Sequence, residues 1–123
     1  MKGTIRVAVE SEYLPDQSEP AAGRYTFAYH VTIRNEGREP ARLLARHWII
    51  TDGEGRRREV RGEGVVGLKP LIPPGESFRY SSFAVLETAV GTMEGSYQMV
   101  GADGRPFEAP IPPFRLAVPG AVN

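Results

Sequence analysis

The stretch YTFAYHVTIR at residues 25–34 decides the fold class of this chain. Large apolar side chains occupy every second position, namely Tyr25, Phe27, Tyr29, Val31 and Ile33. Smaller or polar residues fill the positions between them. Alternation with a period of two is typical of a β-strand with one buried face and is incompatible with a helix.

The same pattern predicts further strands on both sides of this stretch. They are expected near residues 5–9, 41–52, 77–86, 95–100, 107–111 and 114–118. In the segment 41–52 we expect Leu44, Trp48 and Ile50 to form the buried face. Segments rich in Pro, Gly, Asp and Asn separate the strands at 14–23, 35–40, 52–55 and 70–77.

Seven to eight short strands joined by frequent turns predict an all-β chain folded as an antiparallel β-sandwich. Trp48 lies in the third strand, where fibronectin type III and immunoglobulin-like sandwiches place a core tryptophan. Tyr97 resembles the corner tyrosine of such folds. Together these two residues favour a sandwich of the fibronectin type III or immunoglobulin-like kind.

The composition limits the class of protein. The length of 123 residues is that of a single domain, spanning 1–123. Fifteen basic and fifteen acidic side chains cancel, so no net field favours nucleic acid or an acidic membrane. No apolar run approaches the ~20 residues that span a bilayer. The lack of cysteine excludes disulfides and thiolate chemistry, and fits a cytoplasmic protein.

Residues 61–67 read RGEGVVG and have the G-x-G-x-x-G spacing of dinucleotide-binding loops. That function requires a helix after the loop, whose N-terminus meets the phosphates. Here LKPLIPPGES follows, and its prolines exclude the helix. Two interpretations remain: a structural connection in which Val65 and Val66 cover the end of the sandwich, or a nest of backbone amides that binds an anion.

Several segments resemble the ApaG family. They are YTFAYHVTIRNEG (25–37), RHWIITDGEGRRREVRGEGVVG (46–67), LIPPGESFRY (71–80), GTMEGSYQMV (91–100) and IPPFRL (111–116). The resemblance implies a fibronectin type III-like sandwich that acts as a protein-interaction module, in a family linked to cobalt tolerance and magnesium flux. It implies no enzymatic activity. Phe83, Val85 and Ala89 depart from the family pattern, which commonly has a glycine and then prolines in this segment.

Enzymatic and metal-binding chemistry find little support in the residues. A Ser-His-Asp arrangement would need His30 or His47, and there is no G-x-S-x-G elbow. Scattered acids offer oxygen ligands for magnesium, namely Asp52, Glu54, Glu59 and Glu63; alternatively they pair with Arg56, Arg57, Arg58 and Arg61. We therefore predict no catalytic residues, no metal site and no cofactor. The arginine run stands among acids, so nucleic-acid binding is not expected.

Arg46 and His47 flank the core tryptophan. If Trp48 points inward, Arg46 shares its face and must find a carboxylate, a carbonyl or an aromatic ring, whereas His47 faces outward. The candidate contact surface comprises Arg46, His47, Gly62, Glu63, Gly64, Val65, Val66 and Gly67. The first hypothesis is a non-enzymatic module that binds a protein partner there. The alternatives are a pyrophosphate- or nucleotide-binding sensor and a divalent-metal sensor. The oligomeric state stays open.

Overall fold

The computed structural model describes residues 4–121; residues 1–3 and 122–123, at the ends of the expected domain, lie outside the described residues. Within that range the chain forms eight strands and two short 3-10 helices. The strands are β1 (Ile5–Tyr13), β2 (Tyr25–Asn35), β3 (Ala41–Asp52), β4 (Arg57–Glu63), β5 (Leu71–Ile72), β6 (Ser77–Leu86), β7 (Val90–Gly101) and β8 (Pro106–Ala117). The helices η1 (Pro15–Gln17) and η2 (Pro20–Ala22) lie between β1 and β2.

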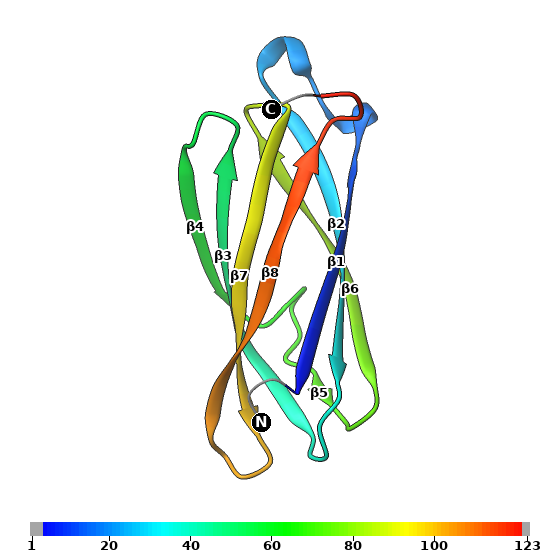
Figure 1. Ribbon diagram of the computed structural model, residues 1–123, viewed down its shortest axis with the longest axis vertical. Coiled ribbons are helices and arrows are strands. Elements are labelled where there is room, and N and C mark those ends of the chain that lie inside the picture. Colours follow the sequence, from blue (N-terminus) through cyan, green and yellow to red (C-terminus); the bar gives the residue numbers. More distant parts are fainter. Residues whose placement is uncertain (1–3, 122–123) are drawn as a thin grey trace.

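The strands form two antiparallel sheets packed face to face (Figure 1). One sheet has the order β1-β2-β6, and the other has the order β4-β3-β7-β8 with β5 added to β3. This arrangement is that of a fibronectin type III-like sandwich, so the predicted fold class is confirmed. Among residues 4–121 no helix has the length and apolar character needed to cross a bilayer.

Strand β2 is the central strand of the smaller sheet. It pairs along its length with β1 and with β6, without a register shift on either side. The inward side chains of Phe27, Val31 and Ile33 are at most 1% exposed, as their alternation predicts. A strand that is paired on both sides satisfies its backbone groups along its whole length, which explains why the longest alternation lies at the centre.

In strand β3 the buried residues differ from those that the sequence predicts. Leu43, Trp48 and Ile50 are buried, but Leu44 is only partly buried. The reason is a β-bulge: Leu43 pairs with Met99 and Ala45 with Gln98, so Leu44 is an extra residue on the β3 side. One inserted residue shifts the inward positions from one parity to the other.

Strand β8 is a second correction. The two predicted strands 107–111 and 114–118 are one continuous strand, β8, in the structure. Met93 pairs with Phe114 and Gly95 with Ile111, so β8 carries one extra residue opposite Glu94. Prolines at 112 and 113 lie in this bulge, on an edge strand, where a missing N–H donor is tolerated.

The core lies between the sheets and is centred on Trp48. Its ring packs against Tyr29, Tyr97 and Phe114, with centroid distances of 5.3, 6.4 and 5.9 Å. Trp48 is 2% exposed, which confirms the expected core tryptophan. Tyr97 is fully buried, but its hydroxyl bonds that of Tyr80 on the facing sheet. A corner tyrosine would bond the nearby backbone instead, so that resemblance does not hold.

Candidate functional site

The glycine segment at residues 61–67 leads from β4 into a tight hairpin and not into a helix. Val65 and Leu68 exchange both backbone hydrogen bonds, with N···O distances of 2.8 and 2.9 Å. Val66 and Gly67 are the two central residues of this turn, with φ angles of 44° and 80°. Positive φ at both positions is the pattern of a type I′ turn. The geometry agrees with the exclusion of a dinucleotide-binding fold.

Each of the three glycines in the G-x-G-x-x-G segment is required for a different structural reason. A Cβ on Gly62 would lie 2.7 Å from Cζ of Arg46, the residue paired opposite on β3. A Cβ on Gly64, which has a φ of 63°, would overlap the carbonyl oxygen of Leu68. Gly67 supplies the positive φ of the turn. These three requirements account for the motif without a phosphate and support the structural interpretation.

Arg46 anchors the hairpin to β3. Its Nη1 donates hydrogen bonds to the carbonyl oxygens of Glu63 at 3.0 Å and of Gly64 at 2.9 Å. The carbonyl oxygen of Leu44, in the β3 bulge, accepts a bond from the amide of Gly64 at 2.8 Å. Arg46 thus finds backbone carbonyls, one of the partners expected for it. The guanidinium and the bulge together hold the loop in one position.

His47 faces away from the core, as predicted, and is bonded to Glu59 on β4. Its Nε2 lies 2.7 Å from Oε1 of Glu59, and its side chain is 19% exposed. This hydrogen bond holds the pKa of the Glu59 carboxyl below its ordinary value. A hollow of about 330 Å³ brings together Arg46, His47, Gly62 and Glu63. The structure therefore gathers half of the predicted site residues around one depression.

The two valines of the hairpin differ in their exposure to solvent. Val65 is 1% exposed and joins the core, as predicted, but Val66 is 56% exposed, so the expectation that it covers the sandwich end is wrong. The turn places Val66 at its outermost corner. Leu68, the next residue after Gly67, is 53% exposed, and Leu71 at the start of β5 is 50% exposed. We refer to Val66 and Leu68 as the apolar tip.

Three backbone amides of the loop are already hydrogen-bonded. The amides of Gly64, Val65 and Leu68 all donate to carbonyl oxygens of Leu44, Leu68 and Val65. An anion-binding nest requires successive N–H groups that converge on an empty concavity. These three amides are already committed, which weakens the anion-binding interpretation.

The acids considered as metal ligands are paired with bases. Asp52 lies 2.7 Å from Arg56, Glu54 lies 3.6 Å from Arg56, Glu59 lies 3.4 Å from Arg61, and Glu63 lies 2.8 Å from Lys69. The hydrogen bond from Lys69 lowers the pKa of Glu63. Across residues 4–121, no three or more carboxylates and imidazoles converge in a way that could hold an ion. The pairing interpretation of these acids is supported.

One group of polar contacts was not predicted from the sequence. On the outer face of the smaller sheet, Nδ1 of His30 lies 2.6 Å from the Ser81 hydroxyl, and Nε2 lies 2.8 Å from a Glu12 oxygen. A hydrolytic nucleophile also needs hydrogen-bond donors that converge on the oxyanion, commonly backbone amides. Ser81 lies within a strand, where successive amides point in opposite directions. The array is therefore explained by cross-strand pairing on an exposed face.

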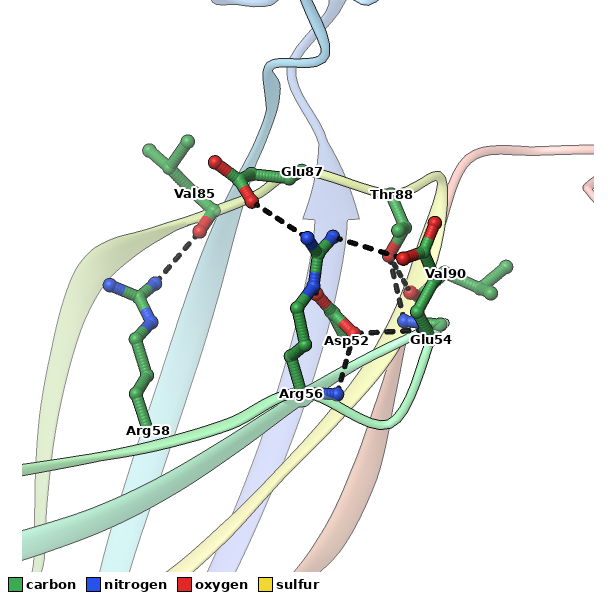
Figure 2. Close-up of polar contacts among 9 residues, drawn as sticks. Asp52, Glu54, Arg56, Arg58, Val85, Glu87, Thr88 and Val90 are labelled. Carbon is green, nitrogen blue, oxygen red and sulfur yellow. Dashed lines mark hydrogen bonds and ion pairs between the residues drawn. The ribbon is translucent and has the colours of Figure 1, made fainter.

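A groove of about 390 Å³ separates the end of β6 from the β3–β4 hairpin. Figure 2 shows the polar contacts at this end. Arg56 lies between three carboxylates, at 2.7 Å from Asp52, 3.6 Å from Glu54 and 3.5 Å from Glu87. Nη2 of Arg58 donates to the carbonyl oxygen of Val85 at 2.8 Å, so a β4 side chain caps a backbone group of β6.

Burial raises the pKa of Asp52 at this groove, but hydrogen bonds from Arg56 and from the amides of Arg56 and Glu54 outweigh it and leave the pKa lowered. The carboxyl is thus ionised wherever the protein is folded near neutral pH. The acids of this groove, Asp52 and Glu87, are both paired with Arg56. Phe83 and Val85 are exposed apolar residues on β6 near this groove. The segment FAVL at 83–86 has apolar residues on both faces of the strand, so it predicts that some of them are exposed.

The fold and these surfaces define a β-sandwich of the fibronectin type III kind with a tight glycine hairpin beside a shallow hollow. Residues 15–101 match the family model described as the ApaG domain. The chain is 62% identical to Protein ApaG of Azotobacter vinelandii over 119 residues, covering 97% of this chain and 94% of that protein. It is 60% identical to Protein ApaG of Pseudomonas aeruginosa over the same shares.

The chain therefore belongs to the ApaG family. Among solved structures it is similar to that of a protein described as ApaA from Bordetella pertussis, with a TM-score of 0.92 and 53% identity over 95% of each chain. The agreement covers the sandwich from end to end, so the resemblance drawn from the sequence segments is confirmed.

Proposed function

We propose that the protein is a non-enzymatic protein-interaction module that contacts its partner through the apolar tip and the adjoining hairpin. One observation carries the proposal: Val66, a β-branched residue, has a φ of 44° and is 56% exposed. Left-handed backbone at a β-branched residue is costly. The side chain is more than half exposed, so its burial offsets little of that cost, and strained residues are concentrated at binding sites.

The neighbours of Val66 support the same conclusion. Leu68 is 53% exposed, so the tip presents apolar area where a turn is ordinarily polar. Arg46 and the carbonyl of Leu44 fix the hairpin. A loop that is already held in its binding conformation loses little conformational entropy on association. The hollow beside Arg46 and His47 adds polar groups at the edge of an apolar contact.

The sensor hypotheses have less support. Three loop amides are occupied, and the nearby acids are paired with Arg56, Arg61 and Lys69. Calorimetry with pyrophosphate, and titration with cobalt and magnesium followed by Trp48 fluorescence, test these alternatives directly. A saturable heat or fluorescence change at micromolar ligand would favour a sensor over the interaction module.

The experiment is affinity capture from native cell extract with the protein and two variants. Val66→Asn keeps a residue that tolerates left-handed backbone but removes the apolar side chain. Val60→Thr is the matched control, because Val60 is an exposed β-branched residue within strand β4 and not in the hairpin turn. A captured protein is then purified and its affinity measured by calorimetry.

We expect Val66→Asn to weaken the affinity about tenfold and Val60→Thr to leave it unchanged. Loss of more than 1 kcal/mol on truncation is the mark of a central interface residue. Equal affinity of wild type and Val66→Asn would overturn the assignment of the tip. Thermal unfolding of each variant separates a loss of contact from a loss of fold.

A further inference from the structure

Strand β6 is an open edge of the smaller sheet. It pairs with β2 on one side, and no strand pairs with its other side among residues 4–121. The carbonyl oxygen of Val85 points to this open side, because it accepts the bond from Arg58. N–H and C=O of one residue point the same way in an antiparallel strand. The odd-numbered residues 79–85 therefore present their backbone groups outward, since β6 has no register shift.

The other edges of the sandwich are protected. Strands β1 and β8, the edges of the two sheets on one side, contact each other; Ser11 on β1 donates to the carbonyl oxygen of Arg115 on β8 at 2.7 Å. Edge strand β4 carries charged side chains at most of its positions. Charges on an edge strand discourage pairing with a further strand. Residues 80–86 of β6 carry none, and Phe83 and Val85 there are 61% and 43% exposed.

The open edge of β6 is complementary to the same edge of a second copy of the chain. In antiparallel pairing about a twofold axis at Phe83, Phe83 lies opposite its own copy and Ser81 lies opposite Val85. The same register places Arg79 opposite Glu87. Arg79 forms no ion pair with any residue that the structure describes, and Glu87 has a 74% exposed side chain that lies 3.5 Å from Arg56. Glu87 directly follows β6, and its pairing with Arg79 of the second copy would compete with its contact to Arg56.

We propose that two copies of this chain associate through β6, antiparallel and with the twofold axis at Phe83. The pairing joins the two smaller sheets into one of six strands, in the order β1-β2-β6-β6-β2-β1. Each outward backbone group of one copy meets that of the other as a hydrogen-bonded pair. Such an interface is isologous, so it closes as a dimer and does not propagate.

The register follows from charge. A twofold axis at Ser81 would place Arg79 opposite Phe83, and an axis at Val85 would place Phe83 opposite Glu87. Only the axis at Phe83 opposes the unpaired arginine to a carboxylate, twice per dimer. Arg58 competes with the association, because its guanidinium occupies the carbonyl of Val85 that the amide of Ser81 in the second copy would meet.

Cysteine substitution maps the interface cleanly, since the chain contains no cysteine. Phe83→Cys should give a disulfide-linked dimer, because Cα atoms in a hydrogen-bonded antiparallel pair are about 5.5 Å apart and within disulfide reach. Ser81→Cys alone should not cross-link, but Ser81→Cys mixed with Val85→Cys should. Val60→Cys, exposed on β4, is the control that should stay monomeric.

A charge swap tests the register in the chain without cysteine. By sedimentation, wild type should dimerise reversibly, and Arg79→Glu should weaken the dimer at least tenfold. Combining Arg79→Glu with Glu87→Arg should restore it, which a variant that merely disturbed folding would not do. Arg58→Ala should strengthen the dimer.

Three outcomes overturn the proposal. The first is a wild type that stays monomeric at millimolar concentration with no cross-link from Phe83→Cys. The second is a dimer in which Ser81→Cys cross-links to itself, which would place the axis elsewhere. The third is capture of an extended segment of another protein on β6 while the chain alone does not self-associate.

Discussion

The hydroxyls of Tyr80 on β6 and Tyr97 on β7 share a hydrogen bond across the interior of the sandwich. It joins the two sheets through polar atoms at a depth where Tyr97 is fully buried. Burial raises the pKa of both hydroxyls well above the ordinary value, because a phenolate there would lose its hydration. The bond is therefore one between two neutral phenols.

We predict that this pair makes the protein sensitive to alkali. Above about pH 10 the unfolded chain releases phenolic protons and the folded chain retains them. The unfolded state then binds fewer protons, so the free energy of unfolding falls as the pH rises. Denaturant unfolding at a series of pH values checks this. Replacing both Tyr80 and Tyr97 by Phe should flatten the decline; an unchanged slope would contradict the assignment.

Gly95 is expected to tolerate no side chain. It pairs opposite Trp48, and a Cβ at this position would overlap the carbonyl oxygen of His47. Gly95→Ala must push β7 away from β3, at a cost of about 3 kcal/mol. Gly75→Ala is the control: Gly75 has a φ of 79° but open space around it, so only backbone strain of about 1 kcal/mol applies. Equal costs for the two variants, by urea unfolding, would argue against the clash.

Asn35 closes the turn between β2 and β3 from inside the protein. Its amide is fully buried, donates to the carbonyls of Glu39 and Ile72 at 2.8 and 2.9 Å, and accepts from the amide of Gly37 at 2.9 Å. Asn35→Asp would set a carboxylate against two carbonyls and should cost about 3 kcal/mol at neutral pH. The folded state of this variant raises the pKa of the new carboxyl, so part of the loss should be recovered as the pH falls through that raised pKa towards the unfolded value of about 4.

Val66 gives a prediction on stability that is independent of any partner. Because its backbone is left-handed, Val66→Asn should stabilise the fold by about 1 kcal/mol. Thermal unfolding measures the gain, and Leu68→Ser, at a neighbouring exposed position, should leave the melting temperature nearly unchanged. A destabilised Val66→Asn would show that the valine side chain contributes contacts to the folded chain.

The sequence predicted much of the fold because single features decided it locally. The alternation at 25–34 identified β2 and its buried face, and prolines after residue 67 excluded a helix. The bulge at Leu44 was not predictable, because alternation through ARLLARHW fits two frames and only the pairing with β7 selects one. Pro112 and Pro113 suggested a break between strands, but an edge strand accommodates them.

The site was predicted less completely, for a physical reason. Arg46 could be assigned a need for a carbonyl or carboxylate from its place beside Trp48, and the carbonyls of Glu63 and Gly64 supply it. The contact of His30 with Ser81 joins residues 51 positions apart and depends on strand register. A β-branched residue such as Val66 is disfavoured at positive φ, so the sequence did not predict that it lies exposed in the turn. The geometry of the turn determines its exposure.

Strand β4 makes part of the sandwich separable from the rest. Among residues 4–121 it pairs only with β3, at the edge of its sheet (Figure 1). Of its seven residues, only Gly62 is partly buried. Its amides should therefore exchange with deuterium through local opening, well before those of β2 or β7. Limited proteolysis should first cut between β3 and β4 for the same reason, so a nicked form that keeps its core is the expected early product of ageing.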